Sequence, residues 1–410
     1  MEFLIPTRTA RPADDPIFAL NAEANARKAK GESVVNATVG ALLDDAGKLA
    51  VLPTVIDALR EVSPAQAAGY APLAGPQAFL QAVIADLLGG TPLAEHAIAV
   101  ATPGGTGALR HAVANFLEPG QALLTSSFYW GPYKTIADEN DRKVATFPMF
   151  KWNGAEGELD VAAFDAGLKK VAAEQGRALV FLNDPCQNPT GYSMRPAEWA
   201  ALRESVEATA AKVPVTLLVD VAYWLYGSGD PRAFLQHLLP LAGKAALAFA
   251  WSASKSFTQY GARVGALIVA DPDASRRKRA LDALTFSCRG TWSNCNHLGL
   301  LAITKLLTDP GLRAKVDGER DGLKALLDGR VRAFNASAAG KGLRYPRYDG
   351  GFFTTVVAPP GVDVARAAAA LRERGVFVVP QGDGLRVALC SVAERDVPRL
   401  VTELVTALAV

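Results

Sequence analysis

The sequence lacks the patterns that mark metal sites, disulfide scaffolds and membrane spans. Its four cysteines are scattered along 410 residues without a C-x-x-C pair, and it has only four histidines. This distribution predicts neither a zinc site nor a disulfide framework. No apolar run approaches the roughly 18 residues that a membrane-spanning helix needs. We therefore expect no bound metal and no membrane partner.

The sequence also lacks an excess of positive or negative charge. Lys and Arg (43) nearly balance Asp and Glu (41), and the formal net charge is +2. A nucleic-acid partner would require a concentrated basic face, so none is expected. The first 16 residues lack the apolar core of a secretory signal. These observations predict a cytoplasmic protein.

The middle of the chain alternates short apolar runs with helical patterns. The runs contain Val, Leu, Ile, Ala and Phe almost continuously, which is typical of strands buried on both faces of a mostly parallel sheet. Strands are predicted at His96–Ala101, Ala122–Ser126, Ala178–Asn183, Val215–Asp220, Ala246–Trp251 and Val264–Ala270. Helices are predicted at Ala78–Leu88 and Thr106–Leu117. The fold class indicated is α/β, with three layers (α/β/α) in the larger domain.

Beyond residue 309 the pattern changes. A long charged amphipathic helix is predicted at Leu312–Phe334, followed by strands punctuated by Gly and Pro and by short helices. The last helix is expected to start with a capping box from Ser391 to Glu394. We expect a large cofactor-binding domain at residues 50–308 and a smaller α+β domain at 309–410. Residues 1–49 would form an N-terminal arm and part of the small domain.

Lys255 follows a strongly apolar strand pattern, where burial is expected. Ser252 precedes it and Arg263 follows it. A buried amine beside cations becomes a usable nucleophile, because its ordinary pKa of about 10.4 is lowered. Hydroxyl and guanidinium groups suit a phosphate. Together they indicate a cofactor with an aldehyde and a phosphate, which is pyridoxal phosphate. The alternative is a surface lysine after a buried strand, which would be the better interpretation if no other motif in the sequence pointed to the same cofactor.

A glycine-rich turn supplies a second phosphate signal. Gly105 and Thr106 lie in the run G-G-T-G between a predicted strand and a predicted helix. Glycine lets the backbone approach a ligand, and a helix N-terminus offers free N–H groups to an anion. The run matches neither a Walker loop nor a G-x-G-x-x-G fingerprint. The alternative is that these glycines have only a structural role in the turn between the strand and the helix.

Polar and aromatic side chains follow other predicted strands. Asn188 lies in N-P-T-G, and Asp220 ends a fully apolar strand, where an unpaired carboxylate costs several kcal/mol. A protonated pyridine nitrogen would pair with Asp220, and a local arginine is the alternative. The aromatic run at 128–133 includes Trp130. Ligands bind outside the carboxyl ends of such strands, so a flat cofactor would lie there.

The chain resembles the fold-type I pyridoxal-phosphate aminotransferases of class I and II, within the aspartate and aromatic aminotransferase branch. The matching motifs occur in the family's order over nearly the whole chain. They are V-V-N-A-T-V-G, G-Y-A-P-L-A-G, G-G-T-G-A-L-R, Y-W-G-P-Y, N-P-T-G, D-V-A-Y, S-A-S-K, G-A-R-V-G, R-G-T-W-S-N and L-R-V-A-L. The resemblance implies transfer of an amino group from an L-amino acid (aspartate, glutamate or an aromatic one) to a 2-oxo acid such as 2-oxoglutarate. The reaction would be ping-pong, through pyridoxamine phosphate.

The resemblance also implies residue roles at the cofactor. Lys255 would bind it as a Schiff base and later move the substrate proton, and Asp220 would pair with the pyridinium nitrogen. Tyr223 and Asn188 would hydrogen-bond the phenolate oxygen, with Trp130 stacked on the ring. The phosphate would be held by Gly105, Thr106, Ser252 and Arg263.

For the substrate, the resemblance implies that Arg386 grips the α-carboxylate and that Gly40 lies against the substrate backbone. Tyr70 would reach the phosphate of a neighbouring subunit, and Arg289 would bind a distal carboxylate across the same interface. The resemblance therefore implies a homodimer in which each subunit contributes residues to the other's active site. An exposed strand arginine is the alternative for Arg386.

The sequence departs from the branch at several positions. Asn183 and Gln187 stand where histidines are usual before N-P-T-G, and Tyr133 stands where a histidine often supports the aspartate. Such changes tune the ring's basicity and leave the amino donor open. Two other functions stay open as well: a pyridoxal-phosphate lyase or decarboxylase, and the ligand-sensing domain of a regulator. The sequence lacks the DNA-binding extension that the regulator would need.

Overall fold

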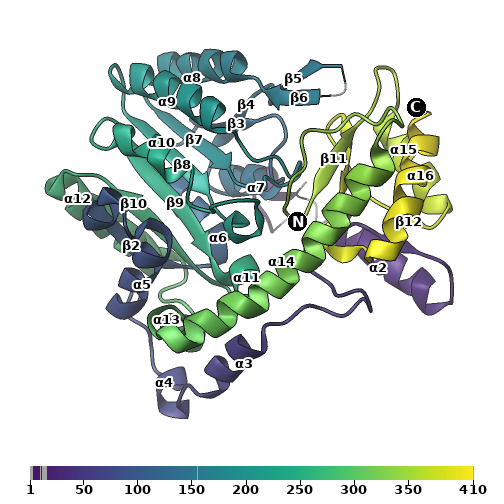
Figure 1. The fold of residues 1–410 in the computed structure, drawn as a ribbon. Coiled ribbons are helices and arrows are strands. Elements are labelled where there is room, and N and C mark those ends of the chain that lie inside the picture. Colours follow the sequence, from purple (N-terminus) through teal and green to yellow (C-terminus); the bar gives the residue numbers. More distant parts are fainter. Residues whose placement is uncertain (1–2, 10, 12–15, 155, 410) are drawn as a thin grey trace.

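A central sheet runs through the larger part of the computed structural model, which describes residues 3–9, 11, 16–154 and 156–409 (Figure 1). Its order is β2-β10-β9-β8-β7-β3-β4. The strands are β2 (Ala97–Pro103), β3 (Ala122–Ser126), β4 (Lys143–Phe147), β7 (Ala178–Asn183), β8 (Val215–Asp220), β9 (Ala246–Ser252) and β10 (Val264–Ala270). From β4 to β9 the neighbours are parallel, and β10 is antiparallel to both of its neighbours. The predicted mostly parallel α/β sheet is confirmed.

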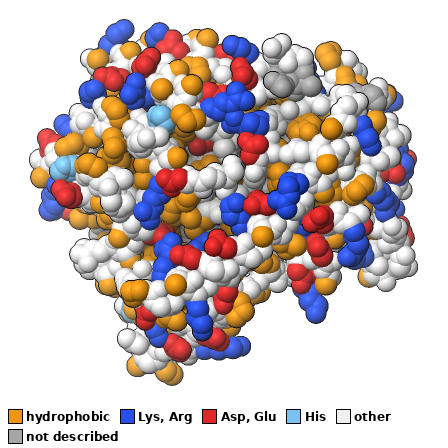
Figure 2. All heavy atoms as spheres, viewed as in Figure 1, with side chains coloured by type: hydrophobic (Ala, Val, Ile, Leu, Met, Phe, Trp, Pro, Cys, Tyr) orange, Lys and Arg blue, Asp and Glu red, His pale blue; other side chains and the backbone are white. Residues whose placement is uncertain are grey.

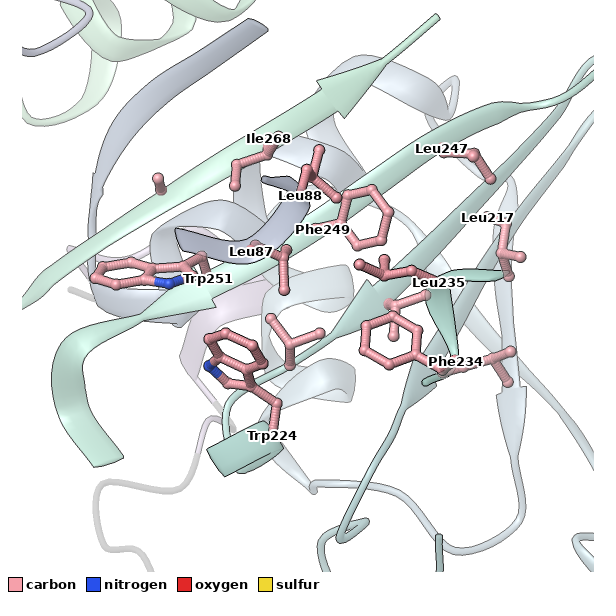
Figure 3. Close-up of a cluster of buried hydrophobic side chains, with 14 of the residues drawn as sticks. Leu87, Leu88, Leu217, Trp224, Phe234, Leu235, Leu247, Phe249, Trp251 and Ile268 are labelled. Carbon is pink, nitrogen blue, oxygen red and sulfur yellow. The ribbon is translucent and has the colours of Figure 1, made fainter. Parts of the chain in front are cut away.

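Both faces of this sheet are covered by helices, because successive side chains of a strand point to opposite faces. In β8, Leu217 and Val219 pack in one apolar cluster and Leu218 packs in another. The first cluster includes α5 (Gln77–Leu88), α8 (Val161–Gln175), α9 (Pro196–Ala210), α10 (Leu235–Leu238) and α13 (His297–Thr308). The second includes α6 (Gly104–Phe116), α7 (Pro132–Glu139) and α12 (Ala274–Thr291). Figure 3 shows side chains of α5, β8, β9 and β10 packed in the first cluster.

The C-terminal part has its own sheet and core. Strands β11 (Thr354–Val357), β14 (Gly384–Val387) and β13 (Val379–Gln381) pair antiparallel in that order. Near the N-terminus, α2 (Pro16–Ala29) leads to β1 (Val35–Asn36), which pairs with β12 (Val376–Phe377). This core also includes α15 (Val364–Glu373) and α16 (Val397–Leu408). The long helix α14 (Pro310–Ala338) joins the two parts, because Val316 packs in the first core and Phe334 in this one (Figure 1).

Several predicted element starts were wrong, including those of α5 at Gln77 and α14 at Pro310, and three have a clear local reason. The last helix starts at Val397 rather than at a Ser391 capping box, because the Ser391 hydroxyl donates to the carbonyls of Asn36 and Ala388. Helix α6 starts at Gly104 rather than Thr106, so the glycines form its first turn. The preceding strand starts at Ala97 and runs to Pro103, because His96 belongs to a short 3₁₀ turn.

The remaining α-helices and strands are short. They are α1 (Pro6–Thr9), α3 (Pro53–Arg60), α4 (Pro64–Ala68), α11 (Ala253–Ser256) and the hairpin β5 (Phe150–Asn153)–β6 (Glu156–Leu159). Residues 1–2, 10 and 12–15 of the expected N-terminal arm lie outside the described residues. Among the described helices, none is long and apolar enough to cross a membrane. Basic and acidic side chains are interspersed on the face shown in Figure 2.

Candidate functional site

A cavity of about 340 Å³ lies where β7, β8 and β9 end and α6 begins. Most of the site residues predicted from the sequence line it. They are Gly105, Thr106, Trp130, Asn188, Asp220, Tyr223, Ser252, Lys255 and Arg263. The carboxyl ends of β7, β8 and β9 and the amino end of the antiparallel β10 meet at one edge of the sheet, which brings these residues together. The other four predicted residues, Gly40, Tyr70, Arg289 and Arg386, do not line this cavity.

The Lys255 amine is held at the cavity wall, on the short helix α11 that follows β9. Its Nζ donates to the Gly40 carbonyl at 2.8 Å and lies 4.4 Å from the centroid of the Tyr260 ring. Burial and the nearby positive charges of Arg263 and Arg386 lower the pKa of Lys255 to about 8. About a tenth of this amine is therefore neutral at pH 7, and a nucleophile or a general base requires the neutral form.

Asp220 is a buried carboxylate at the end of β8. Its Oδ2 accepts a hydrogen bond from the Tyr133 hydroxyl at 2.7 Å, and its Oδ1 accepts one from the Ala222 amide at 3.2 Å. Burial raises the pKa of Asp220 to about 6, although both donors and the Lys255 charge oppose this rise. Within the described part of the chain Asp220 has no ion pair. The carboxylate can therefore take a cationic N–H group in the cavity.

Arg263 is the matching cation near the start of α6. Its guanidinium donates to the Ser254 hydroxyl at 3.2 Å and to the Thr106 hydroxyl at 3.4 Å, and burial lowers its pKa. No carboxylate among the described residues pairs with it. Gly104 has φ +69°, and a side chain there would collide with this guanidinium. The glycine therefore lets a cation approach the helix N-terminus, where both would attract an anion.

Asn188 and Tyr223 form a polar pair in the same cavity. Asn188 Nδ2 donates to the Tyr223 hydroxyl at 3.3 Å, while Asn188 Oδ1 is buried without a hydrogen-bond partner. Asn183 fixes this arrangement, because its side chain accepts from the Asn188 amide and donates to the Asp220 carbonyl, both at 2.7 Å. A buried polar atom without a partner indicates that a ligand completes the pair.

Arg386 lies next to this cavity rather than on the surface. It is only 4% exposed, so the alternative of an exposed strand arginine was wrong. Its Nη2 donates to the Thr38 carbonyl at 2.5 Å, and its guanidinium lies 4.9 Å from the centroid of the Phe353 ring. The same ring occupies the space that a side chain at Gly40 would need. Arg386 and the Lys255 amine are thus both held by the segment around Gly40.

The structure does not bring Tyr70 and Arg289 to this cavity. Tyr70 is 91% exposed, and Arg289 is exposed in the last turn of α12, where it donates to the Ser293 hydroxyl at 2.8 Å. Thr106 and Arg263 also line a second hollow of about 420 Å³, which includes Trp292. Thr106 and Arg263 are therefore accessible from a second side as well as from the cavity.

Tyr260 and Phe18 are among the lining residues that the sequence analysis did not predict. Tyr260 sits between Lys255 and Arg263 in the chain, and its hydroxyl accepts from the Leu42 amide at 3.0 Å. Its position inside the same motif could have suggested it. Phe18, on α2, also lines the cavity although it is 68% exposed. No local pattern marked this residue.

Comparison with known proteins agrees with this geometry. The family model for aminotransferase class I and II matches residues 32–404. Tyrosine aminotransferase from Klebsiella pneumoniae is 28% identical over 92% of this chain and 94% of its own. Aspartate aminotransferase from Pseudomonas aeruginosa is 27% identical over 90% of this chain and 91% of its own. The crystal structure of an aminotransferase from Anaerococcus prevotii superposes with a TM-score of 0.93 at 30% identity, over 99% of each chain. The chain therefore belongs to the class I and II aminotransferases, and it is a transaminase that uses pyridoxal phosphate.

Proposed function

We propose that this enzyme moves the amino group of an aromatic amino acid, aspartate or glutamate to a 2-oxo acid such as 2-oxoglutarate. The relatives are named for both tyrosine and aspartate, which supports either donor class. Their names support transamination over the lyase, decarboxylase and ligand-sensing alternatives. Transamination is ping-pong, so donor and acceptor would use the same cavity in turn.

One observation carries the cofactor assignment: the same cavity is lined by a buried carboxylate, Asp220, that pairs with no cation and by a half-buried cation, Arg263, that pairs with no carboxylate among the described residues. Asp220 would hold the protonated ring nitrogen, and Arg263 with Ser252, Thr106 and the Gly105 amide would hold the phosphate. Asn188 Nδ2 and the Tyr223 hydroxyl, which lie 3.3 Å apart, would both donate to the ring's phenolate oxygen. Trp130 would cover the ring face.

The residues of this chain then have separate tasks. When bound, pyridoxal phosphate supplies an electron sink for negative charge on the substrate α-carbon. Asp220 keeps the proton on the ring nitrogen, Lys255 takes a proton from the α-carbon, and Arg386 orients the substrate by its α-carboxylate. The lowered pKa of Lys255 suits proton transfer near neutral pH.

Arg386→Lys should raise KM for every amino donor about 10- to 100-fold, with a smaller change in kcat. Lysine cannot form the two parallel hydrogen bonds of a guanidinium to a carboxylate. Steady-state kinetics with an aromatic and an acidic donor would measure this effect. The matched control is Arg374→Lys, because Arg374 pairs with Glu403 at the surface. Unchanged KM values in Arg386→Lys would remove the assignment.

A panel of amino donors against 2-oxoglutarate tests the proposed function, and Arg289→Ala tests its donor class. If Arg289 of a second subunit binds a distal carboxylate, this variant should lose about 10- to 100-fold in kcat/KM for aspartate and glutamate but little for aromatic donors. Arg279→Ala is the control, because Arg279 lies on the same helix and also donates to a serine hydroxyl. Equal losses for both donor classes would contradict the role of Arg289.

The same proposal includes a homodimer of two-domain subunits. The exposed Tyr70 ring would enter the second hollow of a partner subunit beside Thr106 and Arg263. The domains would be residues 50–308 and 309–410, the latter with part of 1–49, which is supported by the two separate cores. Closure of the small domain would bring Arg386 onto the substrate.

A cytoplasmic location is supported by four buried cysteines that are all free thiols.

A further inference from the structure

Tyr133 is buried directly behind the Asp220 carboxylate. It lies in the first turn of α7 and is 1% exposed. Its ring packs edge-on against Phe181, with centroids 5.2 Å apart, and against Trp130, with centroids 5.9 Å apart. These contacts leave the phenol one orientation, in which its hydroxyl donates to Asp220 Oδ2 at 2.7 Å. Tyr133 itself does not line the cavity, so its hydroxyl can act on the cofactor only through Asp220.

The chemistry of this donor differs from that of an imidazole. Burial and the neighbouring Asp220 raise the pKa of the Tyr133 phenol well above its ordinary value. The proton of this hydrogen bond therefore stays on tyrosine throughout the working pH range. A histidine would change its charge near neutral pH, and tyrosine does not. The other titratable groups that act on Asp220 and Tyr133 here are Lys255 and Tyr223.

We propose that Tyr133 is a positioning residue that keeps Asp220 ionised and turned toward the cavity with a permanently neutral donor. Because Asp220 also accepts from the Ala222 amide, the two donors fix both carboxylate oxygens. The proton on the cofactor's ring nitrogen would thus depend on a phenol that never makes direct contact with the cofactor. The inference rests on the proposed function, in which Asp220 holds that nitrogen.

Tyr133→Phe in the holoenzyme tests this inference, because it keeps the packed ring and removes only the donor. We expect pyridoxal phosphate to dissociate about tenfold more readily, the energy scale of one hydrogen bond to a charged group. The pH midpoint of the cofactor's visible absorbance should move upward, because a ring nitrogen that loses its proton no longer withdraws electrons. The loss in turnover should fall on kcat rather than KM. Tyr129→Phe is the matched control, because its ring stacks on Tyr133 at 6.2 Å and its hydroxyl does not contact Asp220.

A double-mutant cycle with Asp220→Ala separates positioning from packing. If Tyr133 acts through Asp220, Tyr133→Phe should change neither cofactor retention nor the absorbance midpoint in the Asp220→Ala background. Equal effects in both backgrounds, or a Tyr133→Phe holoenzyme that matches wild type, would overturn the inference. These outcomes leave the proposed function intact provided that wild type binds pyridoxal phosphate and Asp220→Ala weakens it. Wild-type protein that does not bind the cofactor would instead refute the proposed function.

Discussion

Lys255→Ala should lower the rate of transamination by about 10⁴-fold or more, because it removes both the nucleophile and the general base of the site. Pyridoxal phosphate should still bind, since Arg263, Asp220 and Asn188 are unchanged, but without a covalent bond. In the wild type, the absorbance that develops after adding pyridoxal phosphate to cofactor-free protein should form faster as the pH rises through about 8. The pKa of the buried amine sets this midpoint, because only the neutral amine attacks an aldehyde.

The control for this prediction is Lys305→Ala, which removes an exposed lysine paired with Glu61 and should leave turnover unchanged. A Lys255→Ala enzyme that kept more than about a tenth of wild-type turnover would contradict the assignment, since general-base catalysis alone contributes about 10²-fold.

Asp220→Asn should stabilise the cofactor-free protein and yet reduce kcat about 10²- to 10³-fold, the scale of removing one preorganised electrostatic contact. Burial raises the pKa of Asp220 from 3.8 to about 6, so ionising this carboxylate in the folded protein costs about 3 kcal/mol at pH 7. Asparagine removes that cost and its Oδ1 still accepts the Tyr133 hydrogen bond, while its Nδ2 faces the Ala222 amide donor, which offsets part of the gain. Urea denaturation of both proteins without pyridoxal phosphate would measure the difference in free energy of unfolding.

The pH dependence of this difference has a definite sign. Because the pKa of Asp220 is higher folded than unfolded, the folded state binds the extra proton between pH 3.8 and about 6. The destabilising charge is therefore fully present above about pH 6 and disappears as the pH falls toward 3.8. The stability gain of Asp220→Asn should fade over the same window. Asp184→Asn is the control for the fall in kcat, because Asp184 is also buried but does not line the cavity. A wild type that is the more stable at pH 7 would contradict this account.

Much of the fold could be predicted because the central strands are continuous apolar runs. The predicted bounds of β3, β7, β8 and β10 agree with the structure, since each strand is buried on both faces and its ends are marked by polar residues or turns. The start of the last helix could not be predicted in this way. The Ser391 hydroxyl is used by the distant carbonyl of Asn36, so a local capping pattern was misleading.

The cofactor side of the site was predictable for a related reason. Asp220 and Lys255 follow strands in the chain, and the topology brings such strand ends together. Contacts between distant segments were not predictable, such as the bond from the Lys255 amine to the backbone carbonyl of Gly40. The position of Phe18 over the cavity depends on how α2 packs, and its sequence context carries no chemical signal.

Borohydride reduction of the wild-type holoenzyme, followed by peptide mapping, tests the central claim most directly. The account predicts one phosphopyridoxyl group, attached to the peptide that contains Lys255, and loss of the visible absorbance on reduction. A protein that gains no such group after incubation with pyridoxal phosphate, or that carries it on another lysine, would contradict the account.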